Sequence, residues 1–467
     1  MNNTLIKKTG VYFIGNIASK ALMAIIIPIY AFFVTPAAAG NYDYWLSLAQ
    51  TAAPIVFLAI WEAILKHLIS SETASCQDKV KDTVLAFLII ALSFSILSIP
   101  IALHVFGYDS EMLISVYVMC WSLGIFQIWQ YFARSLGRTR AFAESGVIAS
   151  IVTFLLILLL VCTLRLQEFG LVASYVSGQA AGLVFLERRI RLLKTFRLRN
   201  ASMHLLRKLL AYSIPCVFNL IAATLTLTIG RMLVMDWFGS EANGLYSFAL
   251  KFANVITAVG SIFSMAVIEE GIIRAKTKGA SEFYTHVSSA LLVLLSALSC
   301  IALPAIALFY DLIAETEFAA SFSLIPLSLL YALMSVMSTQ FGSVFMAVGK
   351  TRSQATTTIA ALIVATVASY NLARPFGLNG IMAGLVIGTA TMMVSRFLLA
   401  QQHLPFTLHP KGLWVLAVLF FLLLMALYAY PFGDTILFHT GCLLVACMLA
   451  LPFALRSIRE ISDVPEG

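Results

Sequence analysis

Long apolar runs recur along the whole chain, separated by short polar stretches. Each run is about 20 residues long, which is the length of a helix that crosses a bilayer. We place spans at 10–34, 41–65, 83–106, 112–133, 146–164, 170–187, 209–231, 243–268, 285–309, 319–346, 355–373, 377–399, 413–430 and 436–455. The pattern predicts an all-α membrane protein with about 14 transmembrane helices.

Composition and charge sharpen this prediction. Of 467 residues, 61% are hydrophobic and only 11% are charged, which is not the balance of a soluble domain. The net charge of +8 would suit a nucleic-acid partner only if it formed one basic patch. Instead, most Lys and Arg residues fall in loops on one side of the predicted membrane, which is the cytoplasmic side by the positive-inside rule. We therefore expect cytoplasmic N- and C-termini and no nucleic-acid partner.

The sequence also repeats itself. AGNYDYWLSL at 39–48 aligns with NGLYSFALKF at 243–252, and LGRTR at 136–140 aligns with VGKTR at 348–352. Six spans return the chain to the same side, so the copies are predicted to be parallel six-helix repeats about a pseudo-twofold axis along the membrane normal, which suits alternating access. The predicted domains are an N-lobe at 1–208 that ends in a basic connector, a C-lobe at 209–402, and two C-terminal helices with a cytoplasmic tail at 403–467.

Several spans carry polar side chains, which are costly in a bilayer and usually functional. Lys20 lies near the middle of the first span, and Lys251 lies on one helical face with Asn254. Facing lobes would gather these charges in one cationic cavity, and phosphate suits such donors. The predicted substrate-binding residues are Asn16, Lys20, Gln50, Trp121, Gln127, Arg231, Lys251 and Asn254.

Each assignment has a structural alternative. Lys251 and Arg231 could snorkel to the outer interface, and Lys20 could form an ion pair with Glu62 or Asp43. Trp121 and Gln127 in the fourth span pair an aromatic ring with an amide, as in many sugar sites, but such residues also pack or form interfacial belts.

Charged residues near the inner ends of spans suggest a cytoplasmic gate. Glu62 occupies this place in the first repeat, and Arg134 follows the fourth span. Solvated helix ends are the alternative reading. The predicted gating residues are Glu62, Arg134, Glu269 and Glu270.

No enzyme chemistry stands out. The histidines are isolated in the sequence, and it has no nucleotide-binding motif, no metal-ligand spacing and no nucleophile motif. We predict a transporter with no catalytic residues, metal or cofactor. Coupling to a proton or sodium gradient stays open, because no ion site can be assigned.

Short motifs resemble a known family. The first span reads N-x-x-x-K and then P-x-Y, the seventh begins Y-S-I-P, the eighth opens G-L-Y-S-x-A-x-K, and G-[RK]-T-R loops follow the fourth and tenth spans. This order is similar to that of polysaccharide-repeat (O-antigen and exopolysaccharide) flippases of the multidrug/oligosaccharidyl-lipid/polysaccharide exporter superfamily. The resemblance covers about residues 5–400.

The resemblance implies a function. It implies a bacterial inner-membrane protein that moves an undecaprenyl-diphosphate-linked oligosaccharide from the cytoplasmic to the periplasmic leaflet. By the same analogy, Lys20, Arg231 and Lys251 would meet the diphosphate. Membrane lipids, a polysaccharide polymerase and chain-length proteins would be partners.

Other functions stay open. Many O-unit flippases have twelve spans, so fourteen leaves a peptidoglycan-precursor flippase as an alternative. A multidrug and toxin extrusion antiporter shares the fold, but such pumps usually carry an acid in the first span, where this chain has Lys20. A membrane polymerase or ligase would need a long periplasmic loop, and none is predicted.

Overall fold

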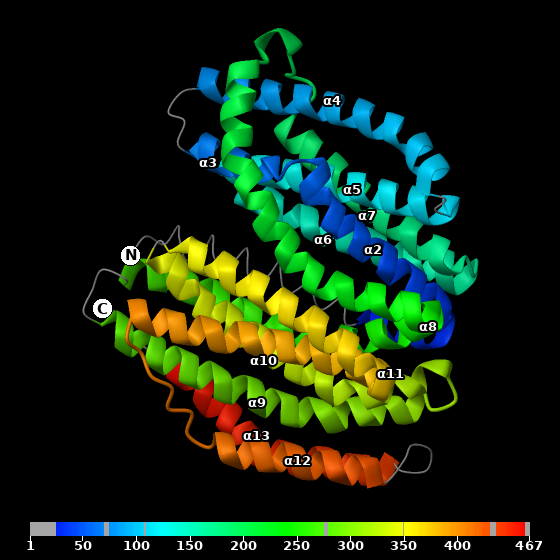
Figure 1. Cartoon of the computed structure of the whole chain (residues 1–467), viewed down its shortest axis with the longest axis vertical. Coiled ribbons are helices and arrows are strands. Elements are labelled where there is room, and N and C mark those ends of the chain that lie inside the picture. Colours follow the sequence, from blue (N-terminus) through cyan, green and yellow to red (C-terminus); the bar gives the residue numbers. More distant parts are fainter. Residues whose placement is uncertain are drawn as a thin grey trace. The chain divides into compact units, whose positions relative to one another are not determined.

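The computed structural model describes residues 25–69, 74–106, 109–274, 279–348, 350–429 and 436–462, and these residues form helices and connections without a strand (Figure 1). The all-helical fold class is therefore confirmed. Residues 25–33 are helical, and the α-helices that follow are α2 Pro36–Val56, α3 Ile60–Ile69, α4 Ala74–Phe106, α5 Ser110–Ser135, α6 Thr139–Ile157, α7 Gln167–Ile190, α8 Met203–Arg274, α9 Ala280–Leu312, α10 Ile325–Ala347, α11 Thr351–His403, α12 Leu413–Ala429 and α13 Ile436–Ser462. The shorter helical segments are a π-helix at Leu158–Thr163 and 3₁₀ helices at Leu198–Asn200 and Glu317–Leu324.

The described residues contain eight helices long and apolar enough to cross a bilayer, or nine if the bent pair α2–α3 is one span. Two of these helices, α8 and α11, each continue through one non-helical glycine, Gly239 with φ 84° and Gly377 with φ 56°. The connections predicted at 232–242 and 374–376 are therefore helical apart from residues at the break. Glycine suits the break because it takes a positive φ at little cost. The count of fourteen stays a prediction.

The span predicted at 41–65 is broken in the structure. Helices α2 and α3 meet at 55°, and Leu58 and Ala59 between them have φ of 48° and 47°. Positive φ is strained for residues with a Cβ, and it persists where packing enforces it. Phe57 supplies that packing, because its buried ring lies 4.8 Å from the Trp121 ring, centroid to centroid. Pro54 lies inside α2, one turn before the break.

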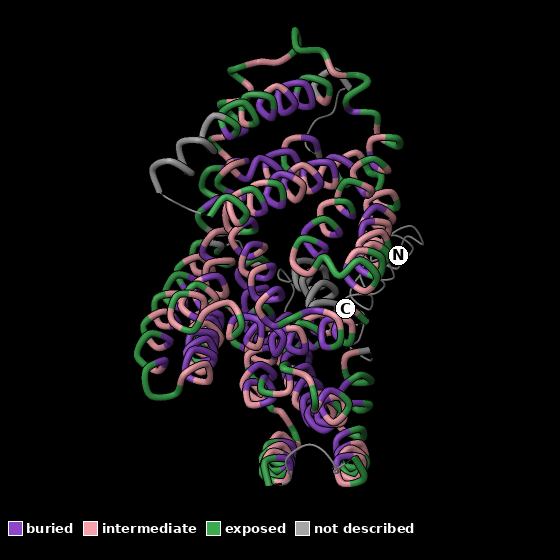
Figure 2. The backbone as a smooth tube through the Cα atoms, turned by 90° about the vertical axis from the view of Figure 1, so that its right-hand side faces the viewer, coloured by how far each residue is buried: buried purple, intermediate pink, exposed green. Residues whose placement is uncertain are grey.

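The chain forms two compact units. Unit 1 contains the described residues up to Val34 and then Asn41–Thr228, and unit 2 contains Thr35–Gly40 and the described residues from Ile229 onward. Within each unit, buried residues line the helix faces that meet (Figure 2). The chain leaves unit 1 inside α8, whereas the sequence places the lobe boundary at 208. The division of the chain into 1–208, 209–402 and 403–467 stays a prediction.

A close helix crossing inside unit 2 joins the start of α2 to the second half of α8. The Asn243 amide donates a 2.7 Å hydrogen bond to the Gly40 carbonyl. A Cβ on Gly40 would overlap the Ser240 carbonyl, and a Cβ on Gly244 would overlap the Pro36 carbonyl. The offset that pairs Gly40 with Gly244 also pairs Pro36 with Ser240, so the two contacts are reciprocal. A local twofold relation between the two repeat starts would produce this reciprocity.

Adding a methyl group to either glycine at this crossing is expected to destabilise the protein. Gly40→Ala and Gly244→Ala should each lower the free energy of unfolding by about 1–3 kcal/mol, because the new Cβ meets backbone atoms that cannot rotate away. Thermal unfolding of the detergent-solubilised protein measures the change. Gly441→Ala in α13 is the matched control, since nothing lies within 4 Å of its Cβ position. Equal melting temperatures for all three variants would contradict the close packing.

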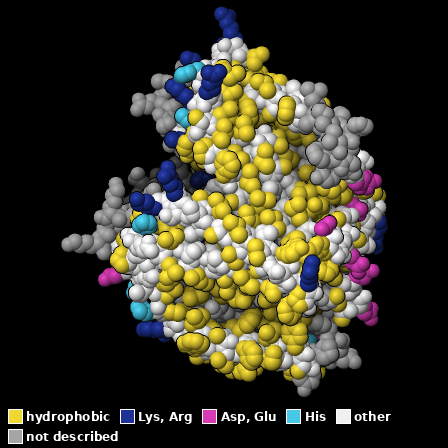
Figure 3. Space-filling view, in the orientation of Figure 1, with side chains coloured by type: hydrophobic (Ala, Val, Ile, Leu, Met, Phe, Trp, Pro, Cys, Tyr) yellow, Lys and Arg dark blue, Asp and Glu magenta, His cyan; other side chains and the backbone are white. Residues whose placement is uncertain are grey.

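The C-terminal helices of unit 2 have surfaces suited to lipid. On α12, one stripe is buried, formed by Leu416, Leu419, Leu423 and Leu427. The rest of this apolar helix is exposed, including Trp414 at 85%. In unit 2, hydrophobic side chains cover the middle of the face in Figure 3, between ends that carry charged residues. An apolar band between charged ends is the surface that a bilayer requires.

Helices α9 and α13 of unit 2 share a buried polar contact. His439 Nδ1 lies 2.6 Å from Asp311 Oδ2, and both side chains are 0% exposed. The sequence analysis had treated the histidines as isolated, and for His439 that reading was wrong. The partner was missed because Asp311 is distant in the sequence.

The long basic connector between α7 and α8 is folded against α4. Buried Lys81 donates to the Thr195 hydroxyl at 2.9 Å, and buried Asp82 accepts from the Arg197 backbone N–H at 3.2 Å and the Asn200 amide at 2.9 Å. The third span is predicted to begin at residue 83, but α4 begins earlier and contains Lys81. The connector is thus tied to unit 1 by neutralised, hydrogen-bonded charges.

Candidate functional site

One polar cluster in unit 1 centres on Tyr131. The Tyr131 hydroxyl donates to Glu62 Oε1 at 3.0 Å and also hydrogen-bonds the Gln127 side chain. Arg134 lies near enough to interact electrostatically. Gln127, Tyr131 and Arg134 follow each other on α5 by four and three residues, so they share one helix face, while the α2–α3 break directs Glu62 toward it. We call Glu62, Gln127, Tyr131 and Arg134 the Tyr131 cluster.

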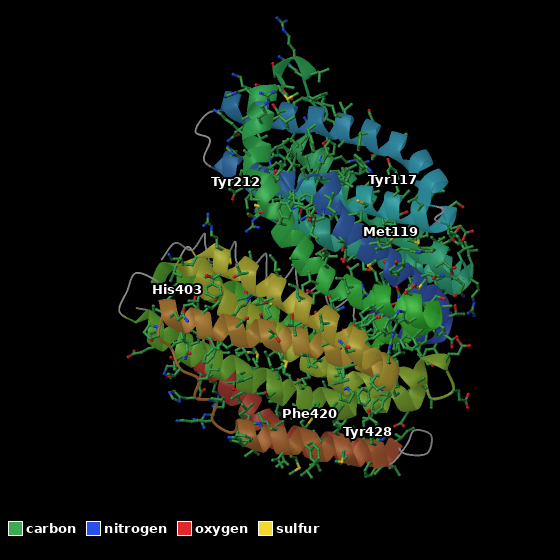
Figure 4. The ribbon with its side chains drawn as sticks, in the orientation of Figure 1. Tyr117, Met119, Tyr212, His403, Phe420 and Tyr428 are labelled. Atoms are coloured by element: carbon green, nitrogen blue, oxygen red, sulfur yellow. The ribbon has the colours of Figure 1, made fainter. Side chains whose placement is uncertain are left out.

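The start of α8 adjoins this cluster. Lys66 Nζ lies 3.9 Å from the centroid of the Tyr212 ring, which is a cation–π geometry. Tyr212, labelled in Figure 4, also interacts electrostatically with Glu62. Helices α3, α5 and α8 therefore meet in unit 1 through a network of one acid, two cations and two phenols. The sequence predicted Gln127 for substrate and Glu62 and Arg134 for gating, and the structure brings these three together.

The predicted sugar-binding aromatic residue is packed. Trp121 is buried, with its ring centroid 4.8 Å from that of Phe57 and 6.3 Å from that of Tyr117. Its indole Nε1 makes no hydrogen bond to any residue that the structure describes. A sugar-contacting role for Trp121 stays a prediction. The neighbouring Trp129 donates to Glu187 at 2.9 Å and so ties α5 to the end of α7.

Unit 2 contains a second polar cluster, around Arg231. The half-buried Arg231 interacts electrostatically with Tyr246 and Tyr331, and the Tyr246 hydroxyl lies close to the Gly230 backbone. Among the described residues, Arg231 Nε, the Tyr246 hydroxyl and the Ser247 hydroxyl are buried without a hydrogen-bond partner. Each such group costs about 1–3 kcal/mol, so several together mark a place where a ligand or water supplies the bonds. We call Arg231, Tyr246 and Tyr331 the Arg231 cluster; Ser247 follows Tyr246 on α8.

The other predicted substrate residues are dispersed. Lys251 is half-buried one turn beyond Ser247 on α8, and its side chain is not without a partner. Asn254, further along the same face, is exposed, and so is Gln50 on α2 in unit 1. Arg231 and Lys251 thus belong to one unit.

Some predicted residues lie outside this description. Asn16 and Lys20 precede the described residues. Glu269 and Glu270 belong to α8, but their side chains are outside the described set. Their roles stay predictions.

A buried arginine was missed by the sequence analysis. Arg396 on α11 is 6% exposed, and its guanidinium donates to Thr357 at 3.2 Å, Thr358 at 2.9 Å and the Ser338 hydroxyl at 3.2 Å and carbonyl at 3.1 Å. Its position inside the span predicted at 377–399 was the available signal. These bonds satisfy the guanidinium, so Arg396 joins α10 to both halves of α11.

Within the described part of the chain, no group of three or more His, Cys, Asp or Glu side chains is placed to hold a metal ion.

The fold matches solved membrane transporters over nearly the whole chain. The lipid II flippase MurJ in an inward closed conformation shares 14% identity, with a TM-score of 0.69 over 97% of this chain and 99% of MurJ. An inward-facing multidrug resistance MATE family transporter of the MOP superfamily gives 14% identity and a TM-score of 0.58, over 89% of this chain and 96% of its own. A MOP superfamily transporter from Pyrococcus furiosus, described by the reverse polarity of its binding pocket, gives 16% identity and 0.58, over 88% and 96%.

These identities are low, so the matches establish the fold alone. A search of curated protein sequences found no significant match. The family profile described as polysaccharide biosynthesis protein matches residues 5–268, more than half of the chain and most of the motifs named above. The resemblance noted in the sequence is thereby confirmed, and this chain belongs to the polysaccharide biosynthesis protein family.

Proposed function

We propose that the protein is a flippase that moves an undecaprenyl-diphosphate-linked oligosaccharide from the cytoplasmic to the periplasmic leaflet of a bacterial inner membrane. Alternating access of two helical lobes would carry the polar headgroup, while the lipid tail stays in the bilayer. Family membership and the transporter fold support this proposal. The O-antigen and exopolysaccharide pathways are the expected destinations of the glycan.

The observation that carries the proposal is the unsatisfied donor set of the Arg231 cluster. The Arg231 Nε–H and the Tyr246 hydroxyl are buried and have no hydrogen-bond partner among the described residues. A diphosphate offers several anionic oxygens, and Arg binds them through two N–H groups at once. Lys251, on the same unit, and Lys20 would add charge to the same headgroup. Asn16, Gln50 and Asn254 would contact its polar parts.

The decisive experiment follows the lipid-linked glycan. Deletion of the gene should strand undecaprenyl-linked oligosaccharide on the inner leaflet and remove the surface polysaccharide, and re-expression should restore both. Purified protein in proteoliposomes should move a labelled lipid-linked oligosaccharide across the bilayer. Normal surface glycan after deletion, with no movement in proteoliposomes, would refute the proposal.

A peptidoglycan-precursor flippase is the second candidate. It is favoured by the MurJ match, which extends over 97% of this chain, whereas the MATE match extends over 89%. Rescue of cells depleted of their own lipid II flippase would select this candidate. A multidrug and toxin extrusion antiporter, the third, would instead make a deletion strain drug-sensitive without changing its glycan.

Removing the charge of Glu62 tests the proposed cytoplasmic gate. Glu62→Gln keeps an acceptor for Tyr131 but ends attraction to Lys66 and Arg134, so we expect flipping to fall several-fold. The change in unfolding free energy should stay within about 1 kcal/mol, since the contact between Glu62 and Tyr131 is partly exposed. Flipping in proteoliposomes and thermal unfolding measure the two effects. Glu144→Gln is the control, because Glu144 forms an exposed pair with Arg140 at 2.7 Å; an equal effect of both variants would remove Glu62 from the gate.

Lys20→Ala should abolish surface glycan while the protein remains inserted and folded. An ammonium at this predicted depth is retained only for a function or a partner, because it costs about 2.5–3.5 kcal/mol in the bilayer centre. Surface glycan staining together with membrane quantities of the protein provides the measurement. Wild-type glycan in this variant would exclude Lys20 from the substrate site.

A further inference from the structure

A cavity of about 330 Å³ opens in unit 2, away from both clusters described above. Its walls come from the first turns of α9, the connector between α11 and α12, and the last turns of α13. A second hollow of about 550 Å³ adjoins it and shares Thr285 and His286. The first cavity is therefore bounded by two helix ends and a connector.

The connector is held firmly over α9. The Thr407 backbone N–H donates to the Thr285 hydroxyl at 3.1 Å, and the His409 N–H donates to the Ser289 hydroxyl at 2.9 Å. The connector then turns at Gly412, with φ 85°, where a Cβ would overlap the Phe453 ring of α13. These contacts fix the chain on either side of Lys411, so the cavity is a built feature of the fold.

The cavity lining is cationic and rich in hydroxyl groups. Lys411 and Arg456 carry permanent charge, and His286 and His409 can add more. Glu460 is the acid in the lining, and its Oε1 accepts from Arg456 Nε at 2.9 Å. Hydroxyls of Thr285, Ser289 and Ser457 also line the cavity, together with Val293 and Phe453.

Cations and hydroxyls above an apolar floor fit a phosphate group that is attached to a lipid. Arg and Lys bind its anionic oxygens, while an apolar wall suits the glycerol and the first methylene groups. Basic pockets between helix ends on the cytoplasmic side of a membrane bind anionic headgroups in this manner. The loop charges predict that this end of unit 2 faces the cytoplasm, and dark blue and cyan side chains gather at this end in Figure 3.

We propose that this cavity binds the phosphate of an anionic inner-leaflet lipid and so anchors α13 and the connector to α9. The ligand chemistry is a phosphate ester held by Lys411 and Arg456. This site is independent of the translocated substrate, because none of its lining residues belongs to the proposed substrate path.

Native mass spectrometry of the full-length protein with phosphatidylglycerol, phosphatidylcholine or inorganic phosphate tests the site. Wild-type protein should retain phosphatidylglycerol in preference to phosphatidylcholine. Lys411→Ala with Arg456→Ala should weaken phosphatidylglycerol binding about 30-fold, since each basic residue near an anionic surface contributes about fivefold. Lys411→Glu, a single surface change, repeats the test with less structural risk.

Lys350→Ala with Arg352→Ala is the matched control, because these residues are exposed basic residues of unit 2 that do not line the cavity. Retention of phosphatidylglycerol by the control and its loss in the cavity variants would support the lipid site. Loss of inorganic phosphate binding, without preference for phosphatidylglycerol, would support the phosphate site with a soluble ligand. Unchanged binding of both ligands in folded cavity variants would overturn the proposal.

Discussion

Replacing Arg231 with alanine is expected to lower the rate of lipid-linked oligosaccharide flipping by about 10- to 100-fold. A hydrogen bond to a charged group contributes about 1.5–3 kcal/mol, and loss of that amount corresponds to this range. The effect arises because the guanidinium offers a buried N–H that has no acceptor among the described residues. The initial flipping rate in proteoliposomes is the measurement, with surface polysaccharide in a complemented deletion strain as the cellular readout.

Two further variants make this result specific. Arg231→Lys should give an intermediate rate, because an ammonium keeps the charge but lacks the two-pronged geometry. Arg374→Ala is the control, since Arg374 is exposed in the same unit and its guanidinium lies 6.0 Å from the Tyr370 ring centroid. If Arg231→Ala flips at the control's rate, the diphosphate does not depend on this residue.

Removing Asp311 from its buried contact with His439 is expected to destabilise the protein by about 3–5 kcal/mol. The side chain of each residue is fully buried, and the 2.6 Å contact joins α9 to α13. Asp311→Ala would leave the imidazole facing an apolar interior without the carboxylate. A large fall in the thermal unfolding temperature of the solubilised protein is the expected observation.

A double variant distinguishes the contact from simple loss of packing. Asp311→Leu with His439→Leu should recover much of the stability lost in either single variant, because apolar replacement of both partners leaves no polar group buried. Glu144→Ala, which breaks the exposed pair with Arg140, should change stability by less than about 1 kcal/mol. Additive losses in the double variant would contradict direct coupling between Asp311 and His439.

The sequence was informative where the signal is local. The α5 helix at Ser110–Ser135 closely follows the span predicted at 112–133, and α9 at Ala280–Leu312 contains the span predicted at 285–309. Hydropathy over a window reports such helices because every residue in a membrane helix meets lipid or protein through its own side chain. The motif order also sufficed to identify the family. Gly40 and Gly244, aligned in the repeat, proved to meet at a helix crossing.

The candidate sites were less accessible to sequence reasoning. Glu62, Gln127 and Arg134 could be named, but their convergence on Tyr131 depends on the bend between α2 and α3. The local sequence does not predict a positive φ at Leu58 and Ala59, because the packing that maintains it involves the Trp121 ring of α5. Likewise, the span predicted at 377–399 contains Arg396, but the sequence does not show that its hydroxyl partners come from α10 and the first half of α11.

By itself, the sequence determined that this protein is a helical membrane protein of a particular family, since hydropathy and short motifs are properties of consecutive residues. Only the tertiary structure decided which polar groups have partners: Asp311 with His439, Arg396 with three hydroxyl-bearing residues, and Arg231 Nε with none among the described residues. Hydrogen bonds act over about 3 Å, so their pairing depends on how distant segments pack. The partners of these polar groups could therefore be identified only from the packing of the helices.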